Sequence, residues 1–173
     1  MKRSDIKEVP EYFEYYINLA EDIELAAALD KSLKQIDDID IKQLKRIGLK
    51  VYTEGKWSVN KIIQHMTDWE RIWCYRTIVF ARNEGTVPEG HDQDIMGDNS
   101  NADELPIEQL MGELRTVRIA TKAMFDTFNR QILETNCKFY KYEMSVLAMG
   151  FTIIGHQIHH FNIIKEKYFP LGK

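Results

Sequence analysis

Two histidines late in the chain have the spacing of a chelating pair. The stretch GHQIHH, residues 155–160, interrupts an otherwise apolar helical pattern, and its His156 and His160 are four residues apart. On an α-helix this spacing puts both imidazoles on one face, one turn apart. Because neutral imidazole is the commonest metal ligand in proteins, the pair could hold a metal ion from a single helix.

A third histidine lies at a compatible depth in another helical segment. His65 falls within the apolar stripe of the segment that begins at Ser58, seven residues after that start, and His160 comes eight residues before Tyr168 near the end of the last helix. If the two segments pack antiparallel, the three histidines lie at one level. Three imidazoles leave a coordination position open for water, substrate or a thiolate, as catalytic zinc sites do.

Each histidine taken alone has a structural interpretation. The HxxxH spacing is weak evidence, and with no glutamate after the first histidine it is not the HExxH motif of zinc proteases. A single histidine in an apolar stripe is usually a core residue, whereas three at one depth favour a site. We expect His159, a quarter-turn away, to be a polar neighbour or surface residue, and His91 to be exposed.

Polar residues after His65 have two interpretations each. Asp68 and Glu70 lie within helical reach and could accept a hydrogen bond from an imidazole, but surface charge or an ion pair with Arg71 explains Glu70 at least as well. Arg76 could bind an anionic substrate, although a salt bridge at the end of the bundle is the favoured role.

Cysteine and tryptophan residues of the same segment have plain structural roles in this interpretation. Cys74 lacks a histidine or aspartate partner in the sequence, and a buried free cysteine is commonly a small apolar filler. For Trp57, Trp69 and Trp73, core packing or a dimer contact is favoured over a ligand-stacking role. None of these residues is assigned chemistry.

Four long helices are predicted to position these residues. Apolar residues recur at intervals of three and four, and strand-like alternation is scarce. The helices are expected over 12–37, 58–83, 106–134 and from 145 to a point before Pro170, with a short helix at Ile41–Ile47. This pattern predicts an all-α four-helix bundle. The long connection, residues 84–105, would let the second and third helices run parallel and gives an up-down-down-up order.

Composition is that of an ordinary globular protein. A chain of 173 residues suits one domain, 1–173, with 44% hydrophobic and 29% charged residues and no run long enough to span a membrane. The net charge of −4 argues against nucleic-acid binding, which needs a basic surface. No secretory signal is recognisable, and Cys74 and Cys137 lack CxxC spacing, so we expect reduced thiols and a cytoplasmic location.

The sequence resembles the DinB-like superfamily, also called the DinB/YfiT-like family. The resemblance is carried by GKWSVNKIIQHMTDWERIWCYRTIVFAR (55–82), ELRTVRIAT (113–121) and GHQIHHFNIIKEKY (155–168). It implies the same bundle order, often a homodimer, and a divalent metal, typically nickel or zinc, bound by His65, His156 and His160. Where the common motif has GHE, this chain has Gln157, so a role of that carboxylate in acid–base chemistry is not carried over.

The leading functional hypothesis is a metal-dependent enzyme acting on a small molecule. Some members of the superfamily are transferases or isomerases that use low-molecular-weight thiols such as bacillithiol or mycothiol, so the resemblance favours a thiol-dependent S-transferase acting on small electrophiles. The alternatives are a metal-dependent hydrolase and a non-catalytic, metal-binding dimeric module related to stress. A cavity that reaches the open metal position would favour catalysis, whereas sealed ligands would favour a structural role.

Overall fold

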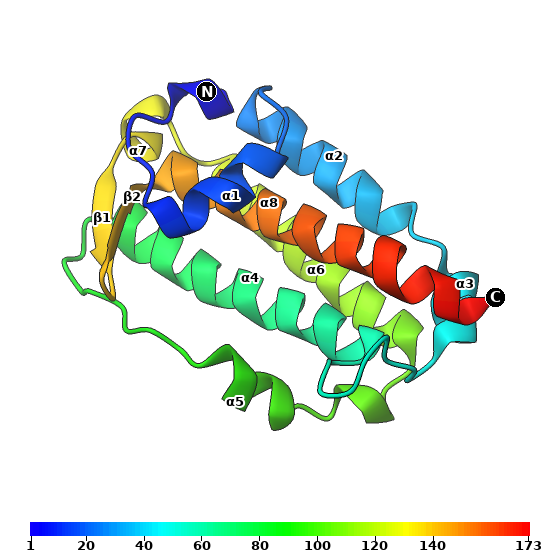
Figure 1. The fold of residues 1–173 in the computed structure, drawn as a ribbon. Helices are drawn as coiled ribbons and strands as arrows, with labels where there is room; N and C mark the ends of the chain where they lie inside the picture. Colours follow the sequence, from blue (N-terminus) through cyan, green and yellow to red (C-terminus); the bar gives the residue numbers. More distant parts are fainter.

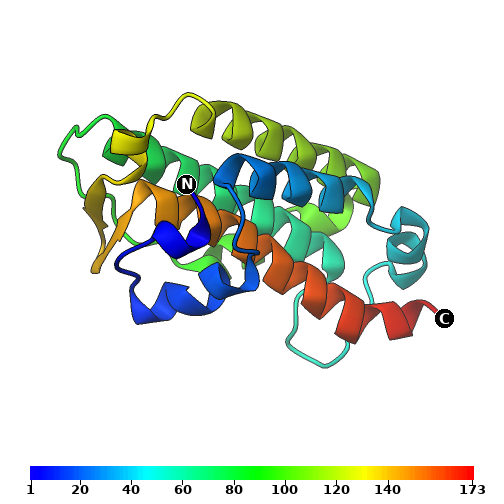
Figure 2. The same cartoon turned by 90° about the horizontal axis from the view of Figure 1, so that it is seen from above.

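The computed structural model describes residues 1–173 except for the side chain of Cys137, so the predicted free thiol of Cys137 lies outside the described part. The chain is mostly helical, as predicted, and its four long helices form a bundle (Figures 1 and 2). These helices are α2 (Leu25–Asp37), α4 (Val59–Ala81), α6 (Ile107–Phe125) and α8 (Val146–Ile163).

Shorter elements complete the fold. They are α1 (Glu11–Leu19), α3 (Ile41–Ile47), α5 (Gln93–Asp98), α7 (Arg130–Leu133) and the strands β1 (Asn136–Phe139) and β2 (Tyr142–Ser145). Single 3-10 turns cover Arg3–Asp5, Ala102–Glu104 and Phe169–Gly172, and a π-helical turn, Ile164–Tyr168, extends α8.

The second and third long helices in chain order, α4 and α6, run in the same direction. Figure 1 shows α4 and α6 running toward the hairpin end, with α2 and α8 running the opposite way. Side-chain contacts agree, because Asn60 near the start of α4 donates to the carbonyl of Leu105 just before α6, and Cys74 contacts Thr121 further along both helices. Residues 84–105, which include α5, carry the chain back along the bundle. His65, early in α4, is therefore opposite the late part of α8.

The apolar core consists of two clusters that meet at the level of the histidines. The first cluster includes the buried apolar residues of α4 from Val59 to Met66. It also includes Phe161 of α8 and the buried residues that follow it. The other takes residues from Trp73 onward in α4 and up to Ile154 in α8. Between them, polar side chains occupy positions that would otherwise be core. The three candidate ligands lie in or next to this interval.

Helix α8 is the most enclosed of the long helices. Every residue from Val146 to Gln157 is buried, and α1, α2 and α4 pack against the helix. Nevertheless, no described helix combines the length and the apolar content that crossing a lipid bilayer requires. The apolar character of α8 is explained by neighbours within the bundle.

The first predicted helix is interrupted, which corrects the expectation of one helix over 12–37. The chain forms α1 and α2 with a break at residues 20–24. The N-terminal segment pairs with this break: the N–H of Leu25 donates to the carbonyl of Met1 at 2.9 Å, and the Asp22 carboxylate accepts the N–H of Ser4 at 2.8 Å. These contacts replace hydrogen bonds of a continuous helix, and α1 instead packs on α8.

The third predicted helix ends earlier than expected, and a β-hairpin follows it. Helix α6 stops at Phe125, and Asn129 starts α7 by accepting the N–H of Ile132 at 3.0 Å, a favourable N-cap. Strands β1 and β2 then pair antiparallel, with Phe139 opposite Tyr142. The hairpin was not predicted, and neither were the helical turns within residues 84–105.

Candidate metal centre

Three histidines from two helices converge inside the bundle. Nε2 of His65 on α4 lies 3.1 Å from Nε2 of His156 on α8, and Nε2 of His160 lies 3.0 Å from the same atom of His156. One ring nitrogen from each residue lies within 4.8 Å of the others. The structure therefore brings together the three histidines that the sequence singled out.

The two helices that carry the histidines both begin at a serine cap. Ser58 accepts the N–H of Lys61 at 3.1 Å at the start of α4, and Ser145 accepts the N–H of Ala148 at 3.1 Å at the start of α8. Such caps satisfy backbone donors that have no partner within the helix and fix where it begins. With both starts fixed and the helices antiparallel, the depth of each histidine in the bundle follows from its position in the sequence.

Burial keeps the three imidazoles uncharged. It lowers the pKa of His65 from 6.5 to about 4, since the ring is only 6% exposed. Burial, followed by the neighbouring imidazoles, lowers the pKa values of His156 and His160 well below 6.5. At neutral pH each ring therefore has one nitrogen with a free lone pair, which is the form that binds metals.

The donor set fits a divalent metal ion. A neutral imidazole carries a single N–H, so three nitrogens pointing at one another form a concentration of lone pairs that hydrogen bonds among them satisfy only in part. Nδ1 of His160 is also buried, and it has no hydrogen-bond partner in the part of the chain that the structure describes. Three imidazole donors suit zinc, nickel, copper and iron alike, and they leave a coordination position open.

Tryptophan rings surround the cluster. The ring centroids of Trp57 and Trp69 lie 5.1 and 5.4 Å from that of His65, and the centroid of Trp73 lies 4.7 Å from that of His156. As predicted, the three tryptophans pack in or against the apolar core, and Trp69 and Trp73 also line a cavity.

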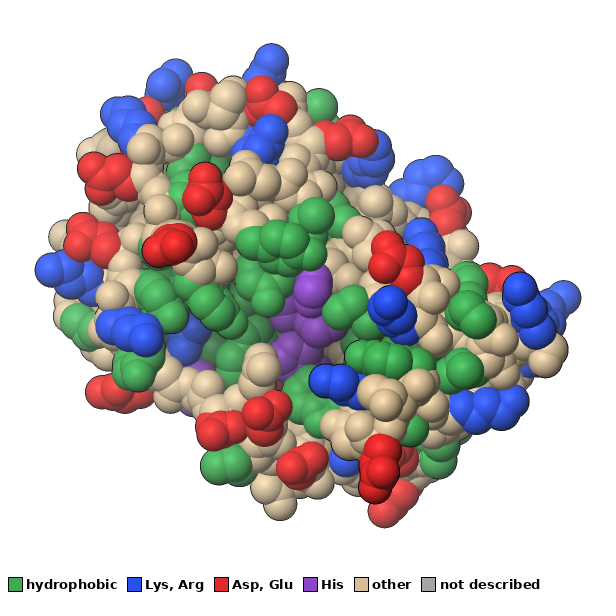
Figure 3. Space-filling view, viewed as in Figure 1, with side chains coloured by type: hydrophobic (Ala, Val, Ile, Leu, Met, Phe, Trp, Pro, Cys, Tyr) green, Lys and Arg blue, Asp and Glu red, His purple; other side chains and the backbone are tan. Residues whose placement is uncertain are grey.

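That cavity, of about 460 Å³, includes His156 in its wall. A second cavity of about 270 Å³ reaches His160, and Figure 3 shows histidine atoms at the bottom of a hollow bordered by hydrophobic side chains. The larger volume is typical of small-molecule sites. Its wall is rich in aromatic side chains, among them Phe13, Tyr16, Trp69, Trp73, Phe139 and Tyr142.

Sequence reasoning missed the part of this wall that comes from α1 and the hairpin. Two aromatic runs, YFEYY at 12–16 and FYKY at 139–142, supply it. The second run has the residue types that favour strands, and that signal could have indicated the hairpin. Nothing in the sequence places either run beside His156, because the contact depends on how α1 and the hairpin pack on α8.

The remaining two histidines are outside the cluster. His159 is half-buried, and its Nδ1 lies 3.1 Å from the hydroxyl of Tyr15 on α1, in keeping with a polar neighbour. His91 is exposed, as expected, but it also lines the larger cavity, where its ring centroid lies 6.4 Å from that of Trp69.

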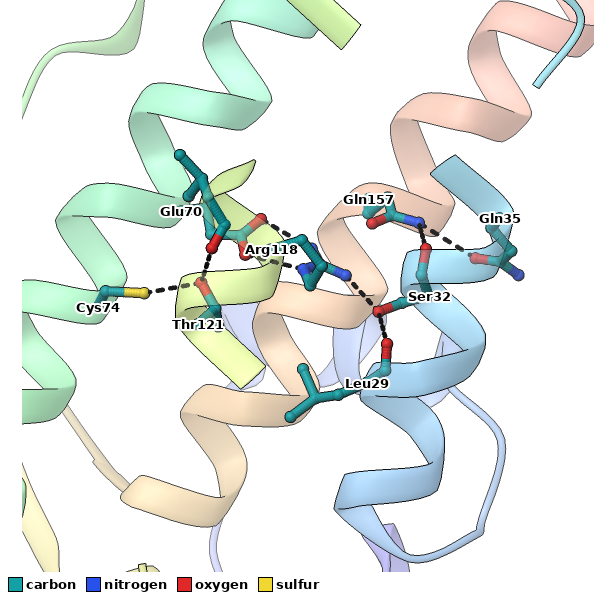
Figure 4. Close-up of polar contacts among 9 residues, drawn as sticks. Leu29, Ser32, Gln35, Glu70, Cys74, Arg118, Thr121 and Gln157 are labelled. Atoms are coloured by element: carbon teal, nitrogen blue, oxygen red, sulfur yellow. Dashed lines mark hydrogen bonds and ion pairs between the residues drawn. The ribbon is translucent and has the colours of Figure 1, made fainter. Parts of the chain in front are cut away.

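Neither role considered for Glu70 is correct. The residue is 2% exposed, and its two carboxylate oxygens each accept a 2.8 Å hydrogen bond from Arg118 of α6 (Figure 4). Arg71 instead pairs with Glu113 of α6 at 2.8 Å and contacts Asp68 at 3.4 Å. Among the described residues, no hydrogen bond joins Glu70 or Asp68 to His65. The imidazole rings are thus held by aromatic packing rather than by these carboxylates.

The Glu70–Arg118 pair belongs to a polar network that crosses the bundle (Figure 4). Arg118 also donates to the hydroxyl of Ser32 on α2, and the amide of Gln157 on α8 donates to the carbonyl of Ser32 at 2.9 Å. The network thus connects all four long helices. Gln157 adjoins His156 in the sequence, but its side chain points toward α2.

Arg76 does not form the expected salt bridge. It is 4% exposed, donates to the carbonyl of Glu89 at 2.7 Å and lies over the ring of Phe139, 4.7 Å from its centroid. Among the described residues no carboxylate pairs with it, and burial lowers the pKa of its guanidinium. Arg76 also lines the larger cavity.

Among the described residues, no histidine or carboxylate is hydrogen-bonded to Cys74. Its Sγ lies 3.1 Å from Oγ1 of Thr121, and burial raises the pKa of the thiol to about 11. A thiol with this pKa stays protonated at neutral pH and is a poor nucleophile. The prediction that Cys74 carries no chemistry agrees with this environment.

Comparisons with known proteins agree with the arrangement of helices. Residues 23–164 match the family model described as the DinB superfamily. Among solved structures, the chain is similar to YfiT from Bacillus subtilis, which is described as "a probable metal-dependent hydrolase with an unusual four-helix bundle topology". The sequence identity is 15% and the TM-score 0.62, over 92% of this chain and 88% of that chain. No curated protein matches the chain. At this identity the likeness to YfiT shows the shared fold.

Proposed function

The chain belongs to the DinB superfamily, and on this premise we propose that it is a metal-dependent enzyme acting on a small molecule, with His65, His156 and His160 as the ligands of one divalent ion. The observation that carries the proposal is the cavity of about 460 Å³ that has His156 in its wall. A structural metal site is closed by its ligands, whereas a catalytic site keeps a position open toward substrate. Nickel and zinc are the metals we expect first.

Different residues of the chain have different roles at such a site. Three neutral imidazoles would hold an ion without neutralising its charge. When bound, a divalent metal supplies Lewis acidity that lowers the pKa of a water or thiol beside it. Trp69 and Trp73 cover the histidines on the side of the cavity and limit access of bulk water. The aromatic wall binds the apolar part of a substrate.

A low-molecular-weight thiol is the nucleophile that suits these residues best. Water attack usually needs a general base, and no described carboxylate is hydrogen-bonded to the histidine cluster. Gln157, where the common motif has glutamate, points toward α2. A thiol loses its proton far more easily than water does. Its sulfur then bonds to an electrophilic carbon, the leaving group departs with the electron pair of the broken bond, and the thiol proton passes to solvent.

Hydrolysis is the second candidate. YfiT is described as a probable metal-dependent hydrolase, and His91 in the wall of the larger cavity offers an imidazole that could accept a proton from water. A hydrolase would need no thiol. The two reactions are therefore separated by whether turnover depends on added thiol.

The test uses protein reconstituted with zinc or nickel and two chromogenic substrates, a chlorodinitrobenzene with and without added thiol and a nitrophenyl ester. Thiol-dependent turnover that is lost in His65→Ala and kept in His159→Ala supports the transferase. Ester hydrolysis without thiol and with the same histidine dependence supports the hydrolase. Bound metal without turnover in any assay would contradict both and would favour a non-catalytic metal-binding module.

A further inference from the structure

We propose that the cavity beside His156 binds a small carboxylic acid with an apolar, preferably aromatic, body, and that Arg76 holds its carboxylate. The reaction of this ligand at the histidines rests on the proposed function, whereas its binding at Arg76 does not. It assigns the anionic end of the ligand to Arg76 and the reacting end to the histidine cluster.

The buried guanidinium of Arg76 lacks the partner that such a group normally has. A charged side chain with 4% exposure is usually paired with a carboxylate or bound to a ligand, since burying an unpaired charge is unfavourable. Among the described residues, the guanidinium has one hydrogen-bond acceptor, the carbonyl of Glu89, and its Nε is buried without a hydrogen bond. A guanidinium has several N–H donors in a planar fork that matches a carboxylate. The missing partner is therefore an anion with that geometry.

The surroundings of Arg76 favour a carboxylate joined to an apolar group. The guanidinium lies on the ring of Phe139, which also lines the cavity together with Tyr142. This cation–π contact holds the guanidinium against the aromatic wall of the cavity. Two acidic residues, Glu89 and Asp92, also line the cavity, but both are exposed, so their charges are solvated. The buried part of the wall is aromatic and cationic.

The position of Arg76 relative to the histidines gives the ligand its orientation. Trp73 precedes Arg76 by three residues on α4, so both project from neighbouring positions on one helix face. The ring of Trp73 contacts that of His156 at a centroid distance of 4.7 Å. A ligand held at Arg76 therefore extends across Trp73 toward His156. This arrangement makes Arg76 a binding residue that sets substrate class.

Binding is tested with benzoate as the probe and benzamide as its uncharged match, by titration calorimetry on the full chain, both metal-loaded and chelator-treated. We expect wild type to bind benzoate at least about tenfold more tightly than benzamide, in the presence and absence of metal. Arg76→Met should lose about tenfold or more in benzoate affinity. Arg76→Lys, which keeps the charge but not the fork, should fall in between.

Arg82→Met is the matched control, because Arg82 lies on Phe128 at 5.8 Å and does not line the cavity. It should bind benzoate like wild type, and thermal melting confirms that each variant is folded. Equal affinity of wild type for benzoate and benzamide overturns the proposal without any variant. So does unchanged benzoate affinity in Arg76→Met, or benzoate binding that disappears when metal is removed, which would place the carboxylate on the metal. A failure to bind metal would contradict the proposed function and leave the Arg76 result standing.

Discussion

The backbone of Tyr16 crosses α8 so closely at Gly155 that a β-carbon built on the glycine would lie 1.8 Å from the Tyr16 carbonyl oxygen. No side chain fits at this distance, and the obstacle is backbone rather than a movable side chain. Gly155 immediately precedes His156, and Tyr16 lies in the cavity wall with its ring centroid 5.6 Å from that of His156. The glycine of GHQIHH is thus required for α1 to close the cavity.

Gly155→Ala is therefore expected to displace α1 and to lower the free energy of unfolding by about 3 kcal/mol, in the upper part of the range for overpacked sites. Urea denaturation measures the loss. Gly112→Ala is the control, because a β-carbon there meets nothing within 4 Å in α6, and alanine should stabilise that exposed helical position by about 0.5–1 kcal/mol. Equal effects of the two substitutions would contradict the close approach.

Breaking the buried ion pair between α4 and α6 should lower the free energy of unfolding much more than breaking an exposed ion pair between α2 and α6. Glu70→Gln leaves the Arg118 guanidinium, 1% exposed, without its countercharge, and we expect a loss of roughly 3 kcal/mol. Asp37→Asn removes the partner of Arg115 at the surface and should cost less than about 1 kcal/mol. Chemical denaturation of both variants checks the difference. Similar small losses would mean that the polar network does not hold the helices together.

Acid should destabilise the metal-free protein through the buried histidines. The folded-state pKa of His65 is about 4 and its ordinary value 6.5, so between these pH values the unfolded chain binds a proton that the folded protein excludes. The free energy of unfolding therefore falls as the pH decreases from 6.5 toward 4, by up to roughly 3 kcal/mol for this residue. Above pH 6.5 the imidazole is neutral in both states and contributes no slope.

Comparison with His65→Gln isolates this effect from the carboxylates, which titrate in an overlapping range. Denaturation of chelator-treated wild type and variant at several pH values should give a smaller acid-induced loss in the variant. Parallel pH profiles would show that His65 is not buried as an uncharged group.

The sequence was sufficient to predict the four-helix bundle and the depth of the histidines, for physical reasons that particular residues illustrate. Ser58 and Ser145 mark helix starts because their side chains cap backbone N–H groups. The four-residue spacing of His156 and His160 sets their common face whatever the tertiary structure. His65 could be matched to them because the depth of a residue in a bundle follows from its distance along an uninterrupted helix.

What the sequence could not predict depends on contacts between distant segments. The break between α1 and α2 is stabilised by the N-terminal segment, for example by the hydrogen bond from Leu25 to Met1. The pairing of Glu70 with Arg118 joins residues 48 positions apart, and helix spacing alone suggested nearer partners. The cavity wall combines α1, α4 and the hairpin. Local patterns do not encode these choices.

Metal content tests the central claim most directly. Elemental analysis of untagged protein, purified without chelator and then reconstituted with zinc or nickel, should give about one ion per chain in wild type and in His159→Ala. The ion should be lost in His65→Ala and in His156→Ala, each of which removes one of the converging nitrogens. No metal in reconstituted wild type, or full retention in His65→Ala, would contradict the assignment of the three histidines as its ligands.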